Sequence, residues 1–403
     1  MSRRFFIKVL IALGLGAYFP KLAEASRLEE LHTPQDGYEP LTSVKFLRQV
    51  VTRDSRVSRM IMWQADAEET FQVEWQLVGD EVAHFSEVKR QDLIYSCKLE
   101  GLKAASLYKF RIVAGERATS WQDLRTAGDG AFQMIIFADS QCEHYDVWQR
   151  TADAAHATYP DAELVTVIGD LVDNGEADYQ WRAWHLSAAK ILSGRTFAPV
   201  MGNHECYGVD WFNALPTGYL NQFSLPDNDA KNLGGYFYSF DYGAAHFFIL
   251  NTQFAELDKF KPNMQAAQEY WFRRDAANVN RPWKIVFMHK DIYDYGQDRF
   301  NDIADRFLEL FDELEIDLVF TGHLHTYRNR GQIKGTTYIL CGRAGDQKYV
   351  EPHSTIDNVA YPNQREEPES FIALDVQASE LHLTARTVNG EIIDDFTIKK
   401  GMN

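Results

Sequence analysis

Five short apolar runs in the sequence each end at a polar residue of a kind that binds metal ions. The runs cover residues 132–137, 164–168, 197–201, 285–288 and 318–321. Apolar runs of this length, alternating with longer amphipathic stretches, indicate the buried strands of an α/β domain. Because ligand sites in such sheets lie beyond the carboxyl ends of the strands, we expect the polar residues to meet at one edge.

These strand ends carry carboxylates, amides and imidazoles. The residues are Asp139 and Gln141, Asp170, Asn203 and His204, His289, and His323 and His325. A single Asp or His after a strand is usually a cap or a surface group, but that explanation is poor for five strand ends together. Oxygen and imidazole ligands suit divalent or ferric ions, and the set is large enough for two metals.

The first third of the chain has a different pattern. Short alternating apolar runs separated by turn residues, as in residues 71–77, indicate an all-β sandwich. The segment 99–110, with Tyr108 near a strand start, resembles the tyrosine corner of fibronectin type III domains. We therefore expect a fibronectin type III-like domain over residues 26–127 and an α/β domain over residues 128–399.

Residues 1–25 have the pattern of an export signal. Arg3 and Arg4 precede an apolar run over residues 9–19, and a small-residue cleavage site ends at Ala25. The apolar run is too short for a permanent membrane anchor. The paired arginines resemble the twin-arginine signal, whose export machinery carries folded proteins and so suits a protein that acquires metal before export. We expect a periplasmic or secreted protein without a stable membrane anchor.

Charge and cysteine content narrow the function classes. The formal net charge of −17 repels nucleic acid and anionic lipid, so nucleic acid is not an expected partner. None of the four cysteines lies in a CxxC pair. Cys142 and Cys206 each follow a strand-end residue by three positions, which would allow a disulfide, although two buried free thiols are the preferred prediction.

The spacing of the strand-end motifs resembles that of the calcineurin-like metallophosphoesterases, and among them the purple acid phosphatase branch. The matching motifs are Asp139, Gly169-Asp170, Gly202-Asn203-His204-Glu205, His289 and Gly322-His323-Leu324-His325. The resemblance implies a four-layer sandwich of two mixed sheets flanked by helices, preceded by the fibronectin type III-like sandwich. It also implies two divalent or mixed-valence metal ions, of iron, manganese or zinc.

The resemblance further implies a role for each motif residue. Asp170 would bridge the two ions. The remaining ligands would be Asp139 and His325 for the first ion, and Asn203, His289 and His323 for the second. His204 would protonate the leaving oxygen or stabilise the phosphoryl group in the transition state. Two such ions can clamp a phosphate and supply a metal-bound water or hydroxide as nucleophile.

Two positions at the first metal site depart from the family pattern. Purple acid phosphatases have an iron-binding tyrosine three residues after the bridging aspartate, where this chain has Asp173. Many other members have a histidine two residues after the first aspartate, where this chain has Gln141. Gln141 could bind weakly or hold a metal-bound water, and Asp173 could orient neighbouring groups. Asp294 and Tyr295 replace family histidines and are candidate substrate contacts, although ordinary surface loop residues are the favoured interpretation.

The sequence thus predicts an exported dinuclear phosphoesterase for a small phosphorylated substrate, most simply a phosphomonoesterase of the acid-phosphatase type. A phosphodiesterase or nucleotide hydrolase is the alternative, because both reactions use the same metal core. A further alternative, motivated by Gln141 and Asp173, is a catalytically weakened protein that binds phosphorylated ligands. The sequence does not indicate the oligomeric state.

Overall fold

The structure is a computed structural model, and it describes residues 37–294, 299–347, 359–360 and 367–401. The expected export signal and Tyr295 lie outside the described residues. Within the described ranges, every helix is too short or too polar to cross a membrane.

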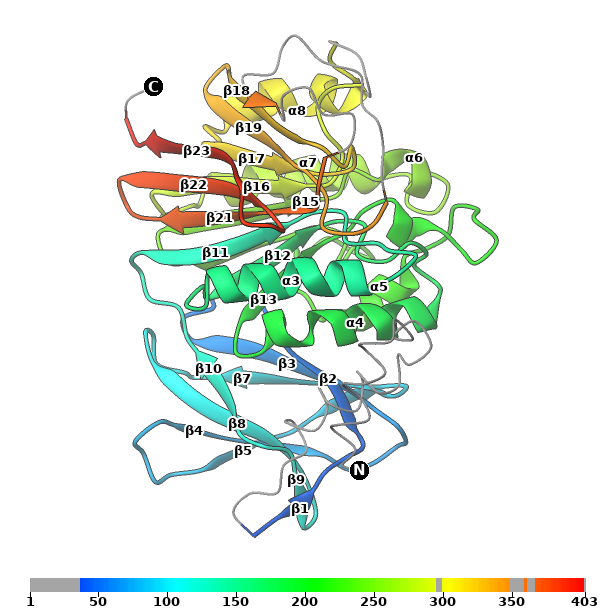
Figure 1. Ribbon diagram of the computed structural model, residues 1–403, viewed down its shortest axis with the longest axis vertical. Helices are drawn as coiled ribbons and strands as arrows, with labels where there is room; N and C mark the ends of the chain where they lie inside the picture. Colours follow the sequence, from blue (N-terminus) through cyan, green and yellow to red (C-terminus); the bar gives the residue numbers. More distant parts are fainter. Residues whose placement is uncertain (1–36, 295–298, 348–358, 361–366, 402–403) are drawn as a thin grey trace.

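The N-terminal part is a sandwich of two sheets, at the lower end of Figure 1. The first sheet contains β1 (Glu39–Pro40), β9 (Arg117–Ala118), β8 (Leu107–Ala114), β4 (Gln72–Leu77), β5 (His84–Ser86) and β10 (Gln122–Arg125). The second contains β2 (Val44–Val50), β3 (Ser58–Ala65), β7 (Ile94–Glu100) and β6 (Lys89–Gln91). Alternating side chains from both sheets, among them Trp63 and Phe110, share one apolar core.

Tyr108 makes the local contact expected of a tyrosine corner. Its phenol oxygen accepts a hydrogen bond from the backbone N–H of Lys103 at 2.8 Å. The bond fixes the chain where it enters β8. The wider likeness to fibronectin type III domains stays a prediction.

The α/β part contains two mixed sheets. One has the order β23 (Ile392–Lys399), β22 (Glu380–Thr387), β21 (Ser370–Val376), β11 (Phe132–Phe137), β12 (Leu164–Ile168) and β13 (Thr196–Val200). The other has the order β14 (Tyr238–Tyr242), β15 (Ala245–Leu250), β16 (Trp283–Met288), β17 (Leu318–Thr321), β19 (Thr336–Cys341), β18 (Tyr327–Ile333) and β20 (Val359–Ala360). The strands that carry the polar motifs are parallel within each sheet.

Helices cover the outer faces of both sheets (Figure 1). The longer ones are α3 (Asp146–Thr158), α4 (Asp178–Leu192), α7 (Met264–Ala276) and α8 (Asp302–Glu313). The shorter ones are η2 (His204–Cys206), α5 (Thr217–Gln222) and α6 (Phe254–Leu257). One face of α8, which contains Ile303, Phe307, Leu310 and Phe311, is buried.

Aromatic contacts show the order of the layers. Phe247 and Phe248 are neighbours in β15 and therefore point to opposite faces of the sheet. The ring of Phe247 lies 6.2 Å from that of Phe132 in β11, whereas the ring of Phe248 lies 4.8 Å from that of Phe272 in α7. The two sheets thus pack against each other, with helices outside, and the predicted α/β fold with several sheets is confirmed.

The two parts of the chain share one sheet, which the sequence did not indicate. β2 of the sandwich pairs in parallel with β13, with Gln49 opposite Thr196 and Val50 opposite Phe197. The result is a ten-stranded sheet that runs through both parts. The boundary expected near residue 128 is therefore bridged by backbone hydrogen bonds. A two-residue parallel contact has no periodicity of its own, so sequence patterning cannot reveal it.

The side chain of Arg48 reinforces this junction. The buried guanidinium of Arg48 donates two hydrogen bonds to the carbonyl of Gln222, at 3.1 and 2.6 Å. Burial lowers the pKa of Arg48 to about 9.

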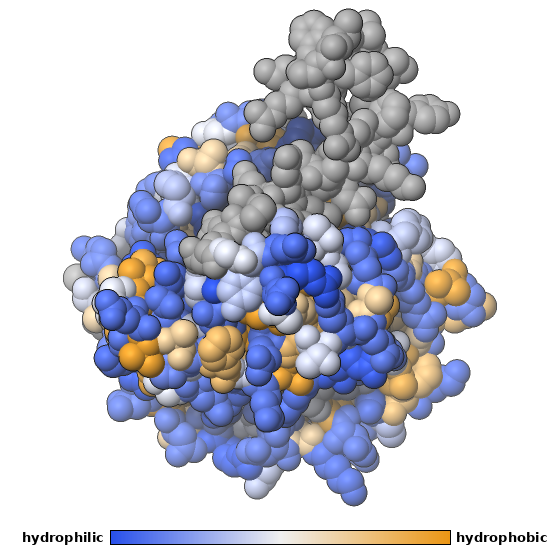
Figure 2. Space-filling view, turned by 90° about the horizontal axis from the view of Figure 1, so that it is seen from below, coloured by the Kyte–Doolittle hydropathy of each residue, from blue (hydrophilic) through white to orange (hydrophobic). Residues whose placement is uncertain are grey.

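The face of the molecule at the sandwich end is mostly hydrophilic, with apolar residues in small groups rather than one patch (Figure 2).

Candidate metal centre

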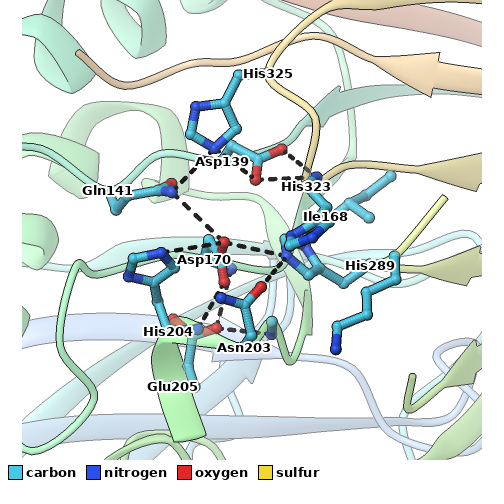
Figure 3. Close-up of polar contacts among 12 residues, drawn as sticks. Asp139, Gln141, Ile168, Asp170, Asn203, His204, Glu205, His289, His323 and His325 are labelled. Atoms are coloured by element: carbon cyan, nitrogen blue, oxygen red, sulfur yellow. Dashed lines mark hydrogen bonds and ion pairs between the residues drawn. The ribbon is translucent and has the colours of Figure 1, made fainter. Parts of the chain in front are cut away.

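The strand-end side chains meet at one edge of the α/β part. Figure 3 shows those of Asp139, Asp170, Asn203, His289 and His325 directed at a common centre. They come from the loops after β11, β12, β13, β16 and β17, so both sheets contribute. All five residues are buried. The predicted convergence at the carboxyl ends of the strands is therefore present.

The ionisable side chains form two clusters that share Asp170. Asp139, Asp170 and His325 offer ligand atoms within 4.8 Å of one another, and so do Asp170, His289 and His323. Asp170 Oδ2 lies 3.1 Å from His289 Nε2, and Asp139 Oδ1 lies 3.4 Å from His325 Nε2. A carboxylate common to two such clusters has the placement of a bridging ligand.

Two amide side chains complete the clusters. Asn203 Oδ1 lies 3.1 Å from His289 Nε2. Gln141 Nε2 lies 3.2 Å from His325 Nε2 and 3.5 Å from Asp170 Oδ2. Gln141 Oε1 is buried and accepts no hydrogen bond from the described residues. A buried carbonyl without a donor is costly, and a half-turn of the amide about its last bond would exchange Nε2 for Oε1 and direct this oxygen at the clusters, where it fits a metal ligand. The residues present therefore fit a pair of metal ions.

Backbone carbonyls orient two of the imidazoles. His289 Nδ1 lies 2.8 Å from the carbonyl oxygen of Ile168, and His325 Nδ1 lies 2.8 Å from that of Gln347. Because a carbonyl oxygen only accepts hydrogen bonds, each Nδ1 carries the proton. Each Nε2 then presents its lone pair to the clusters, as a metal-binding histidine requires.

His204 is oriented in the same way but stands beside the clusters. Its Nδ1 donates to the carbonyl of Asp173 at 2.7 Å, and its Nε2 lies 3.9 Å from Asp170 Oδ2. Burial opposes the charged form of His204, but the charge of Asp170 and the bond to Asp173 outweigh burial and raise its pKa. An imidazole with these contacts can hold a proton at the edge of the centre.

The family model for calcineurin-like phosphoesterases matches residues 132–327, which contain all of these side chains. Residues 132–327 are a calcineurin-like metallophosphoesterase domain. The family resemblance expected from the motifs is thus confirmed.

Plant phosphatases are among the curated relatives of this chain. Phosphoenolpyruvate phosphatase of Allium cepa is 23% identical over 263 residues, which is 61% of this chain and 52% of that protein. Purple acid phosphatase 15 of Arabidopsis thaliana is 23% identical over 320 residues, 68% of this chain and 57% of that protein. The chain therefore spans about half the length of these relatives.

Two solved structures share the fold over most of the chain. Purple acid phosphatase PPD1 of yellow lupin (Lupinus luteus) has a TM-score of 0.71 at 18% identity, over 89% of this chain and 74% of that one. The structure of PhoD has a TM-score of 0.62 at 13% identity, over 91% of this chain and 92% of that one. At these identities the likeness shows the fold.

The backbone of the candidate metal centre is left-handed at four cluster residues. Asp139, Asp170, His323 and His325 have φ values of 51°, 49°, 75° and 56°. Residues other than glycine rarely adopt this conformation, and each instance costs on the order of 1 kcal/mol. All four residues belong to the two clusters, so this strain coincides with the candidate metal-ligand positions.

Glu205 has a role that sequence reasoning missed. Its buried carboxylate accepts hydrogen bonds from the backbone N–H groups of Asp170, Leu171 and Gly202, at 3.0, 2.8 and 2.7 Å. Burial, with a further contribution from the charge of Asp170, raises the pKa of Glu205 to about 7. The position of a glutamate in a polar motif does not indicate whether its carboxylate faces a metal or the backbone. The sequence therefore contained no signal for this role of Glu205.

Two glycines of the motifs allow the loops to approach closely. A Cβ atom at Gly202 would lie 2.1 Å from Asp170 Oδ1, and one at Gly169 would lie 2.3 Å from the ring of His289. Gly169 also has a φ of 75°. Any other residue at either position would displace a cluster side chain.

The remaining predicted residues lie away from the clusters. The carboxylate of Asp173 is 3.5 Å from His204 Nδ1, so Asp173 supports His204 rather than filling the first cluster. Asp294 Oδ2 accepts from Arg299 Nε at 2.6 Å in an exposed loop. Cys142 and Cys206 are both buried free thiols. This confirms the preferred prediction, and the alternative prediction of a disulfide between them is wrong.

Proposed function

We propose that this protein is a phosphatase that hydrolyses small phosphate monoesters with two metal ions. The observation that carries the proposal is the sharing of Asp170 between two clusters, each with imidazole and carboxylate groups. The phosphoesterase domain and the plant phosphatase relatives support the reaction class.

In this proposal the chain's own side chains divide into ligands and a proton donor. The ligands are Asp139, Gln141 and His325 at the first ion, Asn203, His289 and His323 at the second, and Asp170 at both. These oxygen and imidazole donors suit iron, manganese or zinc. When bound, such a pair polarises the phosphoryl oxygens and activates water.

His204 supplies the proton for the leaving oxygen. Its Nε2 faces Asp170, and the carbonyl and carboxylate of Asp173 hold its other nitrogen. The negative charges around it favour the protonated form that a general acid needs. Asp173 therefore acts through His204, as a positioning residue.

A panel of esters tests the choice between monoesters and diesters. The purified protein, loaded in turn with iron, manganese and zinc, is assayed with phenyl phosphate and with diphenyl phosphate. We expect the kcat/KM for the monoester to exceed that for the diester with every active metal. The opposite order would favour a phosphodiesterase, and no hydrolysis with any metal would overturn the reaction class.

We further propose that the protein is exported by the twin-arginine route to the periplasm or beyond. The support is the Arg3-Arg4 pair ahead of an apolar run that ends in a small-residue cleavage site. Replacement of both arginines by lysine should leave uncleaved precursor in the cytoplasm, measured by fractionation and immunoblotting. Unchanged export of this double variant would contradict the route.

A further inference from the structure

The loop over residues 207–213, which follows η2, is held in a fixed shape. Its turn is closed by hydrogen bonds from Gly208 N–H to the carbonyl of Phe212 at 2.9 Å and from Trp211 N–H to that of Gly208 at 2.8 Å. Asn174 Nδ2 donates to the carbonyl of Gly208 at 2.6 Å. Because Asn174 belongs to the segment after β12, the loop is tied to the metal centre.

This fixed loop presents large apolar side chains to solvent. Val209 is 69% exposed, Trp211 is 54% exposed and Phe212 is 74% exposed. Trp211 also has a φ of 65°, a conformation that is unusual for a bulky residue. Exposed aromatic surface and backbone strain both reduce stability, and their coincidence beside a catalytic centre points to a ligand.

The exposed aromatic surface adjoins the proposed proton donor. The ring of Trp211 lies 6.2 Å from that of His204 and is nearly perpendicular to it, at 87°. His204 lies on one side of Asp170 and His289 on the other (Figure 3). An alcohol that takes its proton from His204 Nε2 therefore departs beside the Trp211 ring.

The Trp211 ring packs beside the framework that holds the cluster residues, 6.3 Å from the ring of Tyr207. The neighbouring ring of Tyr207, 5.5 Å from that of His204, accepts a hydrogen bond from Asn203 Nδ2 at 3.3 Å through its phenol oxygen. Tyr207 thus belongs to the metal centre. Trp211 and Phe212 project outward from the same loop, where a substrate can reach them.

We propose that Trp211, with Phe212 beside it, binds the leaving group of phosphate esters whose alcohol carries a planar aromatic ring. This inference rests on the proposed phosphatase function and names the substrate class of the same site. The ring of the alcohol packs on the indole while the phosphate occupies the metal centre. Aromatic contacts of this kind contribute about 3- to 10-fold to binding.

The test uses pairs of esters that differ in the ring but not in leaving-group acidity. The first pair is 2-phenylethyl phosphate and butyl phosphate, and the second is adenosine 5′-monophosphate and ribose 5-phosphate. For each pair we measure the ratio of kcat/KM in the metal-loaded protein. Calorimetry of 2-phenylethylphosphonate and butylphosphonate gives the corresponding ratio of Kd values without turnover.

We expect the wild type to prefer the ring-bearing member, and Trp211→Ala to reduce that preference about 3- to 10-fold. Trp211→Gly should give the same loss, because glycine adopts the left-handed backbone without strain and keeps the loop in place. Trp211→Phe should keep most of the preference. The matched control is Phe85→Ala in β5, since Phe85 is also 54% exposed but lies in the N-terminal sandwich.

The outcomes separate the inference from the proposed function. Preference in the first pair alone supports a simple aromatic alcohol, and preference in both pairs supports any planar ring, including a nucleobase. If the protein binds 2-phenylethylphosphonate more tightly than butylphosphonate but hydrolyses none of the esters, the phosphatase function is overturned and the subsite is supported. If the enzyme is active but neither Trp211→Ala nor Trp211→Gly changes the kcat/KM and Kd ratios, the subsite alone is overturned.

Discussion

Asp170 and His204 have different contacts, and these contacts predict a different role for each residue. Asp170 is the one carboxylate common to both ionisable clusters found among the described residues. His204 belongs to neither cluster, although its Nε2 lies 3.9 Å from Asp170 Oδ2. Loss of Asp170 should therefore affect metal binding, whereas loss of the His204 imidazole should affect proton transfer.

His204→Ala should keep its metal content and lower kcat by about 10²- to 10⁴-fold, the usual contribution of a positioned acid. The loss should be smaller for p-nitrophenyl phosphate than for butyl phosphate, because nitrophenolate leaves without a proton. Steady-state kinetics with both esters, together with metal analysis, checks this. Equal losses for the two esters, or loss of metal, would show that His204 is not the acid.

Most cluster residues could be predicted because each follows a buried apolar run. Asp139, Asp170 and His289 each follow such a run, and the structure brings them into the two clusters. The direction of Gln141 and the role of Glu205 could not be predicted in this way. Both depend on which buried atoms lie opposite the side chain, and a linear pattern contains no information about that.

At the scale of elements, the loops after β12 and β13 are joined by one side chain. Glu205 Oε1 accepts from Leu171 N–H, and Glu205 Oε2 accepts from Asp170 N–H and Gly202 N–H. The two oxygens thus satisfy backbone groups of both loops. Because Asp170 lies in one loop and Asn203 in the other, this side chain sets the relative position of their side chains.

Glu205→Gln should destabilise the fold by about 1 to 3 kcal/mol. Glutamine offers one carbonyl oxygen, and its amide nitrogen would face backbone donors that it cannot satisfy. Urea unfolding of the chelator-treated protein measures the change. The exposed Glu309 of α8 provides the control, since Glu309→Gln removes only a surface ion pair with Lys334 and should have little effect. Equal stability of wild type and Glu205→Gln would contradict the bridging role.

Strand positions followed closely from the sequence, whereas sheet continuity did not. The expected runs 132–137, 164–168 and 318–321 are the observed β11, β12 and β17. Their residues are mostly apolar because nearly every position of these strands is buried. The pairing of β2 with β13 joins distant segments through two residues each, and such a contact leaves no trace in local hydrophobicity.

At the scale of the whole molecule, a charged cluster forms a second junction between the sandwich and the α/β part. The loop after β2 contributes Arg53, whose guanidinium pairs with Asp275 of α7. His246 of β15 lies 2.7 Å from Asp241 and 3.3 Å from Asp275. These groups, with Arg281, line a cavity of about 470 Å³.

The pKa shifts in this cluster predict how stability depends on pH. Burial opposes the charged form of His246, but its hydrogen bonds to Asp241 and Asp275 outweigh burial and raise its pKa above 6.5. Burial likewise opposes the charge of Asp275, but bonds from His246 and Ser239 lower its pKa to about 2. The stabilisation is therefore fully present between about pH 4 and pH 6.5, and it is lost on either side.

The free energy of unfolding should therefore fall as pH rises above 6.5, as His246 loses its proton. In His246→Gln this part of the decline should be absent, so the two pH profiles should converge at alkaline pH. Denaturant unfolding from pH 5 to pH 9 at fixed metal content measures both profiles. Parallel profiles over this range would show that His246 does not titrate as a partner of the two carboxylates.

The metal content of single-residue variants tests the central claim most directly. We expect about two metal ions per chain in the wild type, about one in Asp139→Ala, and almost none in Asp170→Ala, because Asp170 serves both sites. Elemental analysis of the three purified proteins, with circular dichroism to show that each is folded, gives these numbers. A wild type that binds a single ion, or a folded Asp170→Ala variant that keeps two, would contradict a dinuclear centre built around Asp170.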